Sequence, residues 1–146
     1  LADGLDYIHS KGLVYFDVKP TNVLIFVDET RAMFKWADFG LQQVTSNTRG
    51  TFFSGGVQGP HCWLAPEILA LLNEQQNVTK NKQLDTPGRK EATAQSDVFS
   101  LGMICFSFIM GGMHMFGAKN LIAPNILGKR RVNLNSESLV LCHPTH

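Results

Sequence analysis

In the first third of the chain, the apolar residues have a helical spacing at the start and form strand-like runs further on. Apolar residues recur every three or four positions at its start: Leu1, Leu5 and Ile8. This spacing predicts an amphipathic helix that ends at the polar stretch Ser10-Lys11-Gly12. The β-branched run from Val23 to Val27 then predicts a strand. The run from Met33 to Ala37 predicts its partner in a small hairpin.

The second half of the chain has the pattern of helices separated by polar segments. Residues from Pro66 to Leu72 predict a short helix, and residues 73–95 predict a surface insertion because few of them are large and apolar. A longer helix is expected from Asp97 to about Met110, with Ser96 as its N-cap. It is apolar nearly all round, which predicts a buried central helix. A further short helix is expected between Lys119 and Leu127, interrupted at Pro124.

Composition indicates one globular domain. The chain has 146 residues, of which 44% are hydrophobic and 17% charged, and this excludes a disordered chain. A formal net charge of +1 gives no reason to expect nucleic acid or an anionic membrane as a partner. The apolar run from Leu101 to Met110 is about half as long as a membrane span. Because the first residues already have the pattern of a helix interior, we expect a fragment of a longer protein.

The three cysteines lie far apart in the sequence. None belongs to a C-x-x-C pair, so neither a zinc site nor a disulfide framework is expected, and a reducing, cytosolic setting follows. His61 lies beside Cys62, but no third ligand or orienting partner is near them in the sequence. A contact within a loop is therefore expected for this pair.

Three short motifs follow one another in a fixed order. The stretch from Tyr15 to Asn22 has the spacing H-R-D-L-x-x-x-N, with Asp17, Lys19 and Asn22 at the polar positions. Asp38-Phe39-Gly40 follows, and then Ala65-Pro66-Glu67. From about Leu1 to about Gly128 the chain resembles the C-terminal lobe of a eukaryotic protein kinase.

This resemblance implies a fold and a domain organisation. The expected fold is mainly α with a small β hairpin, a kinase-like C-terminal lobe without its N-lobe. Residues 1–146 would form a partial kinase domain with a catalytic loop at 15–22 and an activation segment at 38–67. The insertion at about 73–95 and the buried helix at about 97–110 complete it.

The resemblance also implies a role for each polar residue of the motifs. Asp17 would accept the proton of the attacking hydroxyl, and Lys19 would steady the γ-phosphate of ATP. Asn22 and Asp38 offer the hard oxygen ligands that Mg²⁺ requires, and together with Lys19 they would bind the nucleotide. Asp97 is either an acid favoured by the helix dipole or a brace for the catalytic-loop backbone.

Two residues depart from the kinase pattern. Phe16 stands where many kinases have an Arg that pairs with a phosphorylated activation-loop residue, and a Phe cannot make that contact. Pro60 stands where Ser/Thr kinases usually have a Thr that bridges the residues here numbered Asp17 and Lys19. Activation by phosphorylation of the loop hydroxyls (Thr45, Ser46, Thr48, Thr51, Ser54) through residue 16 is therefore not expected.

Four further stretches are similar to the inositol-requiring kinase/endoribonucleases of the unfolded-protein response. They are Met33–Leu41, Trp63–Leu69, Asp97–Gly102, and Gly112–Gly117 followed by Asn125–Gly128. The similarity implies a Ser/Thr kinase on the cytosolic face of the endoplasmic reticulum membrane, as part of a longer protein. It also implies back-to-back homodimers and a linked ribonuclease, of which this chain has no residue.

Three functions stay open on the sequence. The first is ATP- and Mg²⁺-dependent phosphorylation of a protein substrate, or of the protein itself. The second is a nucleotide-sensing kinase or pseudokinase module that regulates a linked endoribonuclease. The third is an inactive truncated fragment. Because no Gly-rich loop and no V-A-I-K lysine precede the catalytic loop, we expect the isolated stretch to bind ATP poorly and to be inactive.

Overall fold

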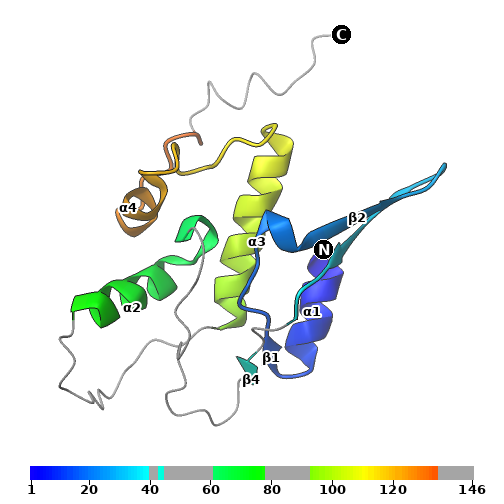
Figure 1. The fold of residues 1–146 in the computed structure, drawn as a ribbon, viewed down its shortest axis with the longest axis horizontal. Coiled ribbons are helices and arrows are strands. Elements are labelled where there is room, and N and C mark those ends of the chain that lie inside the picture. The colour runs from blue at the N-terminus through cyan, green and yellow to red at the C-terminus, as the bar shows by residue number, and fades with distance from the viewer. Residues whose placement is uncertain (40–42, 45–60, 78–92, 135–146) are drawn as a thin grey trace.

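The computed structural model describes residues 1–39, 43–44, 61–77 and 93–134. Its elements follow one another along the chain (Figure 1) as α1 (Ala2–Ser10), β1 (Leu13–Val14), the 3₁₀ turn η1 (Pro20–Asn22), β2 (Val23–Val27), β3 (Ala32–Trp36), β4 (Gln43–Val44), the 3₁₀ turn η2 (His61–Trp63), α2 (Pro66–Asn77), α3 (Ala94–Ile109) and α4 (Ile122–Leu127). No helix in this described part is both long and apolar enough to cross a membrane.

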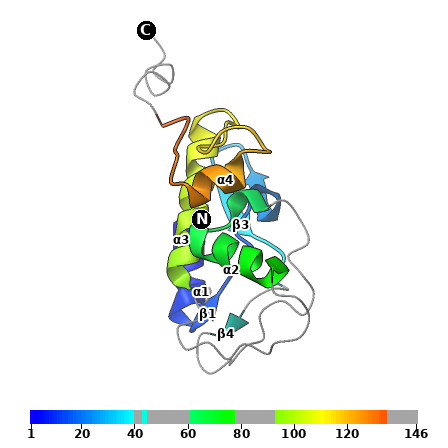
Figure 2. The same cartoon turned by 90° about the vertical axis from the view of Figure 1, so that its left-hand side faces the viewer.

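Helix α3 is the central element of the fold. In Figures 1 and 2, α1 and the β2–β3 hairpin lie on one side of it, and α2 and α4 lie on the other. Each side has its own apolar cluster. The first contains Leu5, Ile8, Tyr15, Val18, Trp36 and Ile104, and the second contains Leu69, Met103, Phe116, Ile122 and Ile126. A third cluster joins the segment after α1 to α2, and contains Val14, Phe16, Ala65, Ile68 and Leu71.

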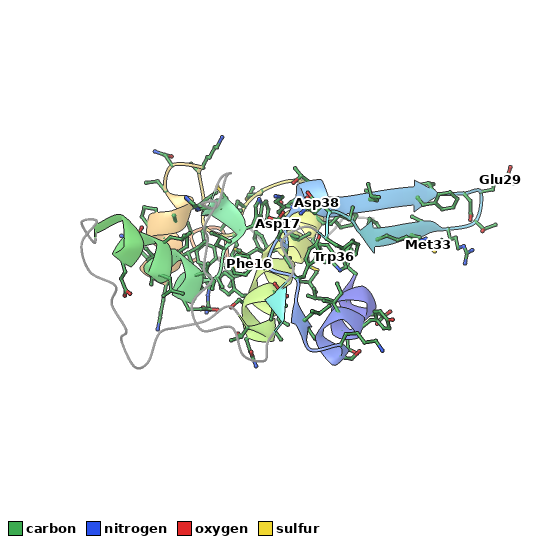
Figure 3. The ribbon with its side chains drawn as sticks, turned by 60° about the horizontal axis from the view of Figure 1, so that its bottom comes forward. Phe16, Asp17, Glu29, Met33, Trp36 and Asp38 are labelled. Carbon is green, nitrogen blue, oxygen red and sulfur yellow. The ribbon has the colours of Figure 1, made fainter. Side chains whose placement is uncertain are left out.

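The predicted hairpin is present, and β2 has the predicted bounds. Its antiparallel register pairs Val23 with Trp36 at the inner end and Val27 with Ala32 at the outer end. The hairpin projects from the body of the molecule, with Glu29 and Met33 far from the helices (Figure 3). A second two-stranded sheet, β1 paired with β4, was not predicted, because two-residue strands carry no periodic signal.

The start of α3 corrects the predicted cap. The helix begins at Ala94, and Thr93 is its N-cap. Ser96 lies in the first turn, where its Oγ accepts a hydrogen bond from the backbone N–H of Thr93 at 3.3 Å. The prediction that Ser96 is the N-cap was therefore wrong, because a Thr three residues earlier has the same capping chemistry.

The prediction that α3 is a buried helix was also too broad, because part of its apolar surface is exposed. Phe108 is 71% exposed and Ile109 67% exposed, so the C-terminal half of α3 has an uncovered apolar side. Phe108 makes an edge-on contact with Phe34 of the hairpin, with 5.9 Å between ring centroids. A groove of about 710 Å³ lies here, and its lining includes Leu1, Ile25, Phe34, Ile104 and Phe108.

Two further predictions about element boundaries were wrong. Helix α2 runs on to Asn77 and α3 starts at Ala94, so the ends of the predicted insertion at 73–95 are helical; residues 78–92 lie outside the described part. Helix α4 begins at Ile122 and contains Pro124 without interruption. Proline is tolerated there because the first turn of a helix needs no backbone N–H donor.

Candidate functional site

The catalytic-loop backbone is held by a carboxylate at the start of α3. Asp97 is 2% exposed, and its Oδ2 and Oδ1 accept hydrogen bonds from the backbone N–H groups of Tyr15 and Phe16, both at 2.8 Å. His9 on α1 contacts the same carboxylate through Nε2 at 2.9 Å. Of the two readings of Asp97, bracing of the loop is therefore observed, and its position in the first turn of α3 suits the helix dipole as well.

The brace supports an unusual backbone conformation. Phe16 has a φ of 70°, in the left-handed region that bulky residues rarely adopt. Such a conformation costs about 1–3 kcal/mol and persists only where the surroundings enforce it. The ring of Phe16 is buried in the cluster with Ala65, Ile68 and Leu71, so both its backbone and its side chain are fixed.

The loop brings three of the predicted site residues together. The carboxylate Oδ2 of Asp17 accepts from Lys19 Nζ at 2.6 Å and from Asn22 Nδ2 at 2.7 Å. Asn22 Nδ2 also donates to the backbone carbonyl of Asp17 at 2.9 Å. Among the described residues no donor contacts Oδ1 of Asp17, which leaves this oxygen available to accept a proton or a hydroxyl hydrogen bond.

Asp38 reaches the same place from the end of the hairpin. Backbone hydrogen bonds connect the two segments, since Ala37 N–H donates to the carbonyl of Asn22 at 2.9 Å. The hydroxyl of Tyr15 donates to the carbonyl of Ala37. Asp38 itself has a φ of 58°. Figure 3 shows Asp17 and Asp38 at the inner end of the hairpin, near Trp36.

Tyr15 lies between these acidic groups. Its side chain is fully buried, and burial raises the pKa of its hydroxyl to about 12. The side chain of Asn22 opposes this shift, and the negative charges of Asp17, Asp38 and Asp97 add to it. The phenol therefore stays protonated at neutral pH and remains a donor to Ala37.

Phe39 packs on the site as well. Its ring meets the edge of the Tyr15 ring with 5.6 Å between centroids, although Phe39 is 50% exposed. Tyr15 in turn contacts the Trp36 ring at 5.3 Å. Phe39, which follows the candidate metal ligand Asp38, is thus in contact with Tyr15, two positions before Asp17. Gly40, which completes this motif, lies outside the described residues.

The side chains at this site suit the binding of Mg²⁺ and a nucleoside triphosphate. Asn22 uses its amide nitrogen toward Asp17, so its amide oxygen is the group left to face a cation. Asp38 supplies a carboxylate, and both are the hard oxygen ligands that Mg²⁺ prefers. Lys19 is the cation beside them for a phosphate. When bound, the metal would neutralise charge on the phosphates of the nucleotide.

Two contacts at the site had not been predicted. One is the imidazole of His9 on Asp97. The other is Glu67, whose Oε1 accepts from Ser96 Oγ at 2.6 Å and thereby joins α2 to the first turn of α3. Both contacts link segments far apart in the chain, so no local spacing signals them.

The pair His61 and Cys62 lies in η2 and makes a loop contact, as predicted. The carbonyl of Cys62 is 2.9 Å from His114 Nε2. Burial raises the pKa of the Cys62 thiol, an effect that the charge of Lys119 opposes, so the sulfur is a poor nucleophile. Within the described ranges, no three His, Cys, Asp or Glu side chains gather as a metal site would require.

Comparison with known proteins identifies the family. The protein kinase domain model matches residues 1–137, so the chain belongs to the protein kinase family.

Among its relatives are one sensor for unfolded proteins and two kinase/endoribonucleases. The "sensor for unfolded proteins in the ER ire1" of Schizosaccharomyces pombe is 34% identical over 97% of this chain. The human "serine/threonine-protein kinase/endoribonuclease IRE2" is 32% identical over 87%, and the IRE1 of Hypocrea jecorina is 30% identical over 95%. The chain spans only 12–14% of the length of these relatives. Its kinase domain is thus of the IRE type.

Proposed function

We propose that this chain is part of a protein kinase that transfers the γ-phosphate of ATP to Ser or Thr residues. The observation that carries the proposal is the arrangement of Asp17, whose Oδ2 is occupied by Lys19 and Asn22 while no described donor contacts Oδ1. A general base needs such a fixed carboxylate with one free oxygen. Within this proposal the chain forms the C-terminal lobe, and the glycine-rich loop belongs to another part of the protein.

Each polar residue has one task in the proposed reaction. Asp17 accepts the proton of the substrate hydroxyl through Oδ1. Lys19, held at 2.6 Å from Asp17, places its positive charge beside the transferred phosphate. Asn22 and Asp38 hold Mg²⁺ through their oxygens. The substrate is another protein or another copy of this protein, and it approaches the face that presents Asp17.

The test is the substitution Asp17→Asn in the full-length protein. Phosphoryl transfer from ATP should fall by about 10²- to 10⁴-fold, because the amide cannot accept the proton. The KM for ATP should change little, since Asp17 is not a metal ligand in this proposal. Asp6→Asn, an exposed change on α1, is the matched control and should retain full activity. Equal transfer by Asp17→Asn and the control would overturn the proposal.

A second function is a nucleotide-sensing module that regulates a linked endoribonuclease. Phe16 favours it, because a residue without charge cannot couple transfer to loop phosphorylation. Pro60, which lies outside the described residues, also favours this second function, because proline has no hydroxyl to bridge Asp17 and Lys19. The names of two relatives include both kinase and endoribonuclease. In this function the parent protein forms homodimers at the cytosolic face of the endoplasmic reticulum.

The two functions differ in what survives Asp17→Asn. A sensing module should retain ATP-dependent dimerisation and RNA cleavage in that variant, since both depend on binding alone. Sedimentation and a ribonuclease assay with and without ATP would measure this in the full-length protein. A protein without affinity for ATP would exclude both functions and favour an inactive fragment.

A further inference from the structure

Phe16, the residue before Asp17, has a strained backbone and a buried side chain. Phe16 has a φ of 70°, which glycine adopts freely but a bulky residue does not. A phenyl ring at such a position must be held there by contacts that outweigh the backbone cost. Two sets of contacts do this, one to the backbone and one to the ring.

The backbone contact comes from α3 and the ring contact from α2. Asp97 Oδ1 accepts the N–H of Phe16 at 2.8 Å. Phe16 is 7% exposed, and its ring is packed in one cluster with Ala65, the first residue of the Ala65-Pro66-Glu67 motif, and with Ile68 and Leu71 of α2. Phe16 thus links the catalytic loop to the end of the activation segment through apolar contacts.

We propose that Phe16 is a positioning residue for Asp17. Resting on the kinase function proposed above, this inference assigns to the ring the task of fixing the catalytic loop against α2. A cation at this position would hold the loop only when a phosphate is present to pair with it. Apolar packing needs no such partner, so the loop is held permanently, and its position does not depend on phosphorylation of the activation segment.

Substitutions at residue 16 in the full-length protein test this role. Phe16→Ala should lower kcat about ten- to hundredfold with a nearly unchanged KM for ATP, because small misplacements of a catalytic group are costly. Phe16→Leu keeps an apolar side chain and should restore most of kcat. Phe16→Arg would place a charge in an apolar cluster and should be as impaired as Phe16→Ala. An Arg variant as active as the wild type would overturn the proposal.

Phe16→Gly separates the ring from the backbone conformation. Glycine adopts a φ of 70° without strain but has no ring to pack on α2. If the ring positions the loop, this variant loses kcat as Phe16→Ala does. If only the left-handed backbone matters, Phe16→Gly is at least as active as the wild type, and the proposal is wrong.

Phe116 provides the matched control for a loss of stability. It is 3% exposed and belongs to the cluster with Leu69, Ile122 and Ile126, which contains no residue of the catalytic loop. Phe116→Ala should destabilise the fold in a similar way yet leave kcat of the folded protein near the wild-type value. An equal fall of kcat in Phe116→Ala would show that residue 16 acts only through stability.

Hydrogen exchange tests the link without any activity. In Phe16→Ala, the amides of residues 15–22 and of the first turns of α2 should exchange faster together. In Phe116→Ala, the amides of residues 15–22 should be affected no more than the rest of the chain, although α2 itself contacts Phe116 through Leu69. If the wild type transfers no phosphate, the proposed function fails, but this measurement still decides the inference. Unchanged exchange in Phe16→Ala would overturn it.

Discussion

Asp97 and Phe16 are 81 positions apart in the sequence, and a hydrogen bond of 2.8 Å joins the carboxylate of one to the backbone N–H of the other. The same carboxylate accepts the N–H of Tyr15. The hydrogen bonds that a buried carboxylate accepts replace the hydrogen bonds to water that it loses on folding. The central helix therefore determines where the catalytic loop lies.

The substitution Asp97→Asn should destabilise the fold by about 2–4 kcal/mol, because it leaves a buried backbone donor facing an amide N–H₂ group. The change keeps the shape of the side chain, so the loss reports hydrogen bonding and charge rather than packing. Urea denaturation followed by far-UV circular dichroism would measure the free energy of unfolding. The exposed Asp6→Asn is its control and should leave that free energy unchanged. Equal stability of the two variants would contradict the brace.

Tyr15→Phe removes the hydroxyl that donates to the carbonyl of Ala37. At pH 7 we expect a loss of about 1 kcal/mol in the free energy of unfolding, the usual net value of one hydrogen bond. The affinity for Mg²⁺ and ATP should also weaken, since Ala37 precedes Asp38. Chemical denaturation and titration calorimetry on the full-length protein would measure the two effects.

The same pair of proteins tests the raised pKa of Tyr15. The folded-state pKa is about 12 and the ordinary value is 10.0, so the folded state retains its proton where the unfolded state loses it. The stabilisation is complete below pH 10 and is lost as pH rises from 10 toward 12. The difference in unfolding free energy between wild type and Tyr15→Phe should therefore shrink over that interval. A difference independent of pH would contradict the shift.

Local patterns in the sequence were sufficient for the hairpin and for the grouping of Asp17, Lys19 and Asn22. The β-branched run in Val23–Val27 indicates a strand without help from the rest of the chain, and the bounds of β2 are confirmed. The three loop residues lie within six positions of one another, so a single turn of chain brings them into contact.

Contacts between distant segments could not be predicted in the same way. The cluster of Phe16 with Ile68 and Leu71 depends on how α2 packs, and the hydrogen bond of Glu67 to Ser96 depends on how α2 meets α3. The exposed side of α3 at Phe108 has the same cause, because apolar periodicity measures hydrophobicity and not coverage by neighbours.

His114 should make the fold sensitive to acid. Its Nδ1 accepts the backbone N–H of Phe116 at 3.2 Å, and its Nε2 donates to the carbonyl of Cys62 at 2.9 Å. The hydrogen bond to Nδ1 requires the neutral ring, whereas the one from Nε2 persists when the ring is protonated. Burial lowers the pKa of His114 below its ordinary value of 6.5, an effect that the hydrogen bond to Cys62 opposes. The stabilisation is thus complete above pH 6.5 and is lost as pH falls through the lowered pKa.

The measurement is the free energy of unfolding of wild type and His114→Gln between pH 5 and pH 8. The wild type should lose stability relative to the variant as the pH falls below about 6.5, since glutamine does not titrate. Parallel curves over this range would show that the His114 ring takes no part in the acid response.

Two glycine-to-alanine substitutions should have opposite outcomes although both lie in helices. At Gly102 in α3 an added Cβ meets nothing within 4 Å, so Gly102→Ala should stabilise the fold by about 0.5–1 kcal/mol through reduced backbone entropy of the unfolded chain. At Gly4 in α1 the Cβ would lie 3.1 Å from Cδ1 of Trp36. Trp36 is 8% exposed, and its Nε1 donates to the carbonyl of Leu1 at 3.0 Å, so the ring cannot move aside easily. Gly4→Ala should therefore give no gain or a loss, as measured by the urea midpoint at an unchanged m-value. An equal gain at both positions would mean that Trp36 is not held against α1 as the structure has it.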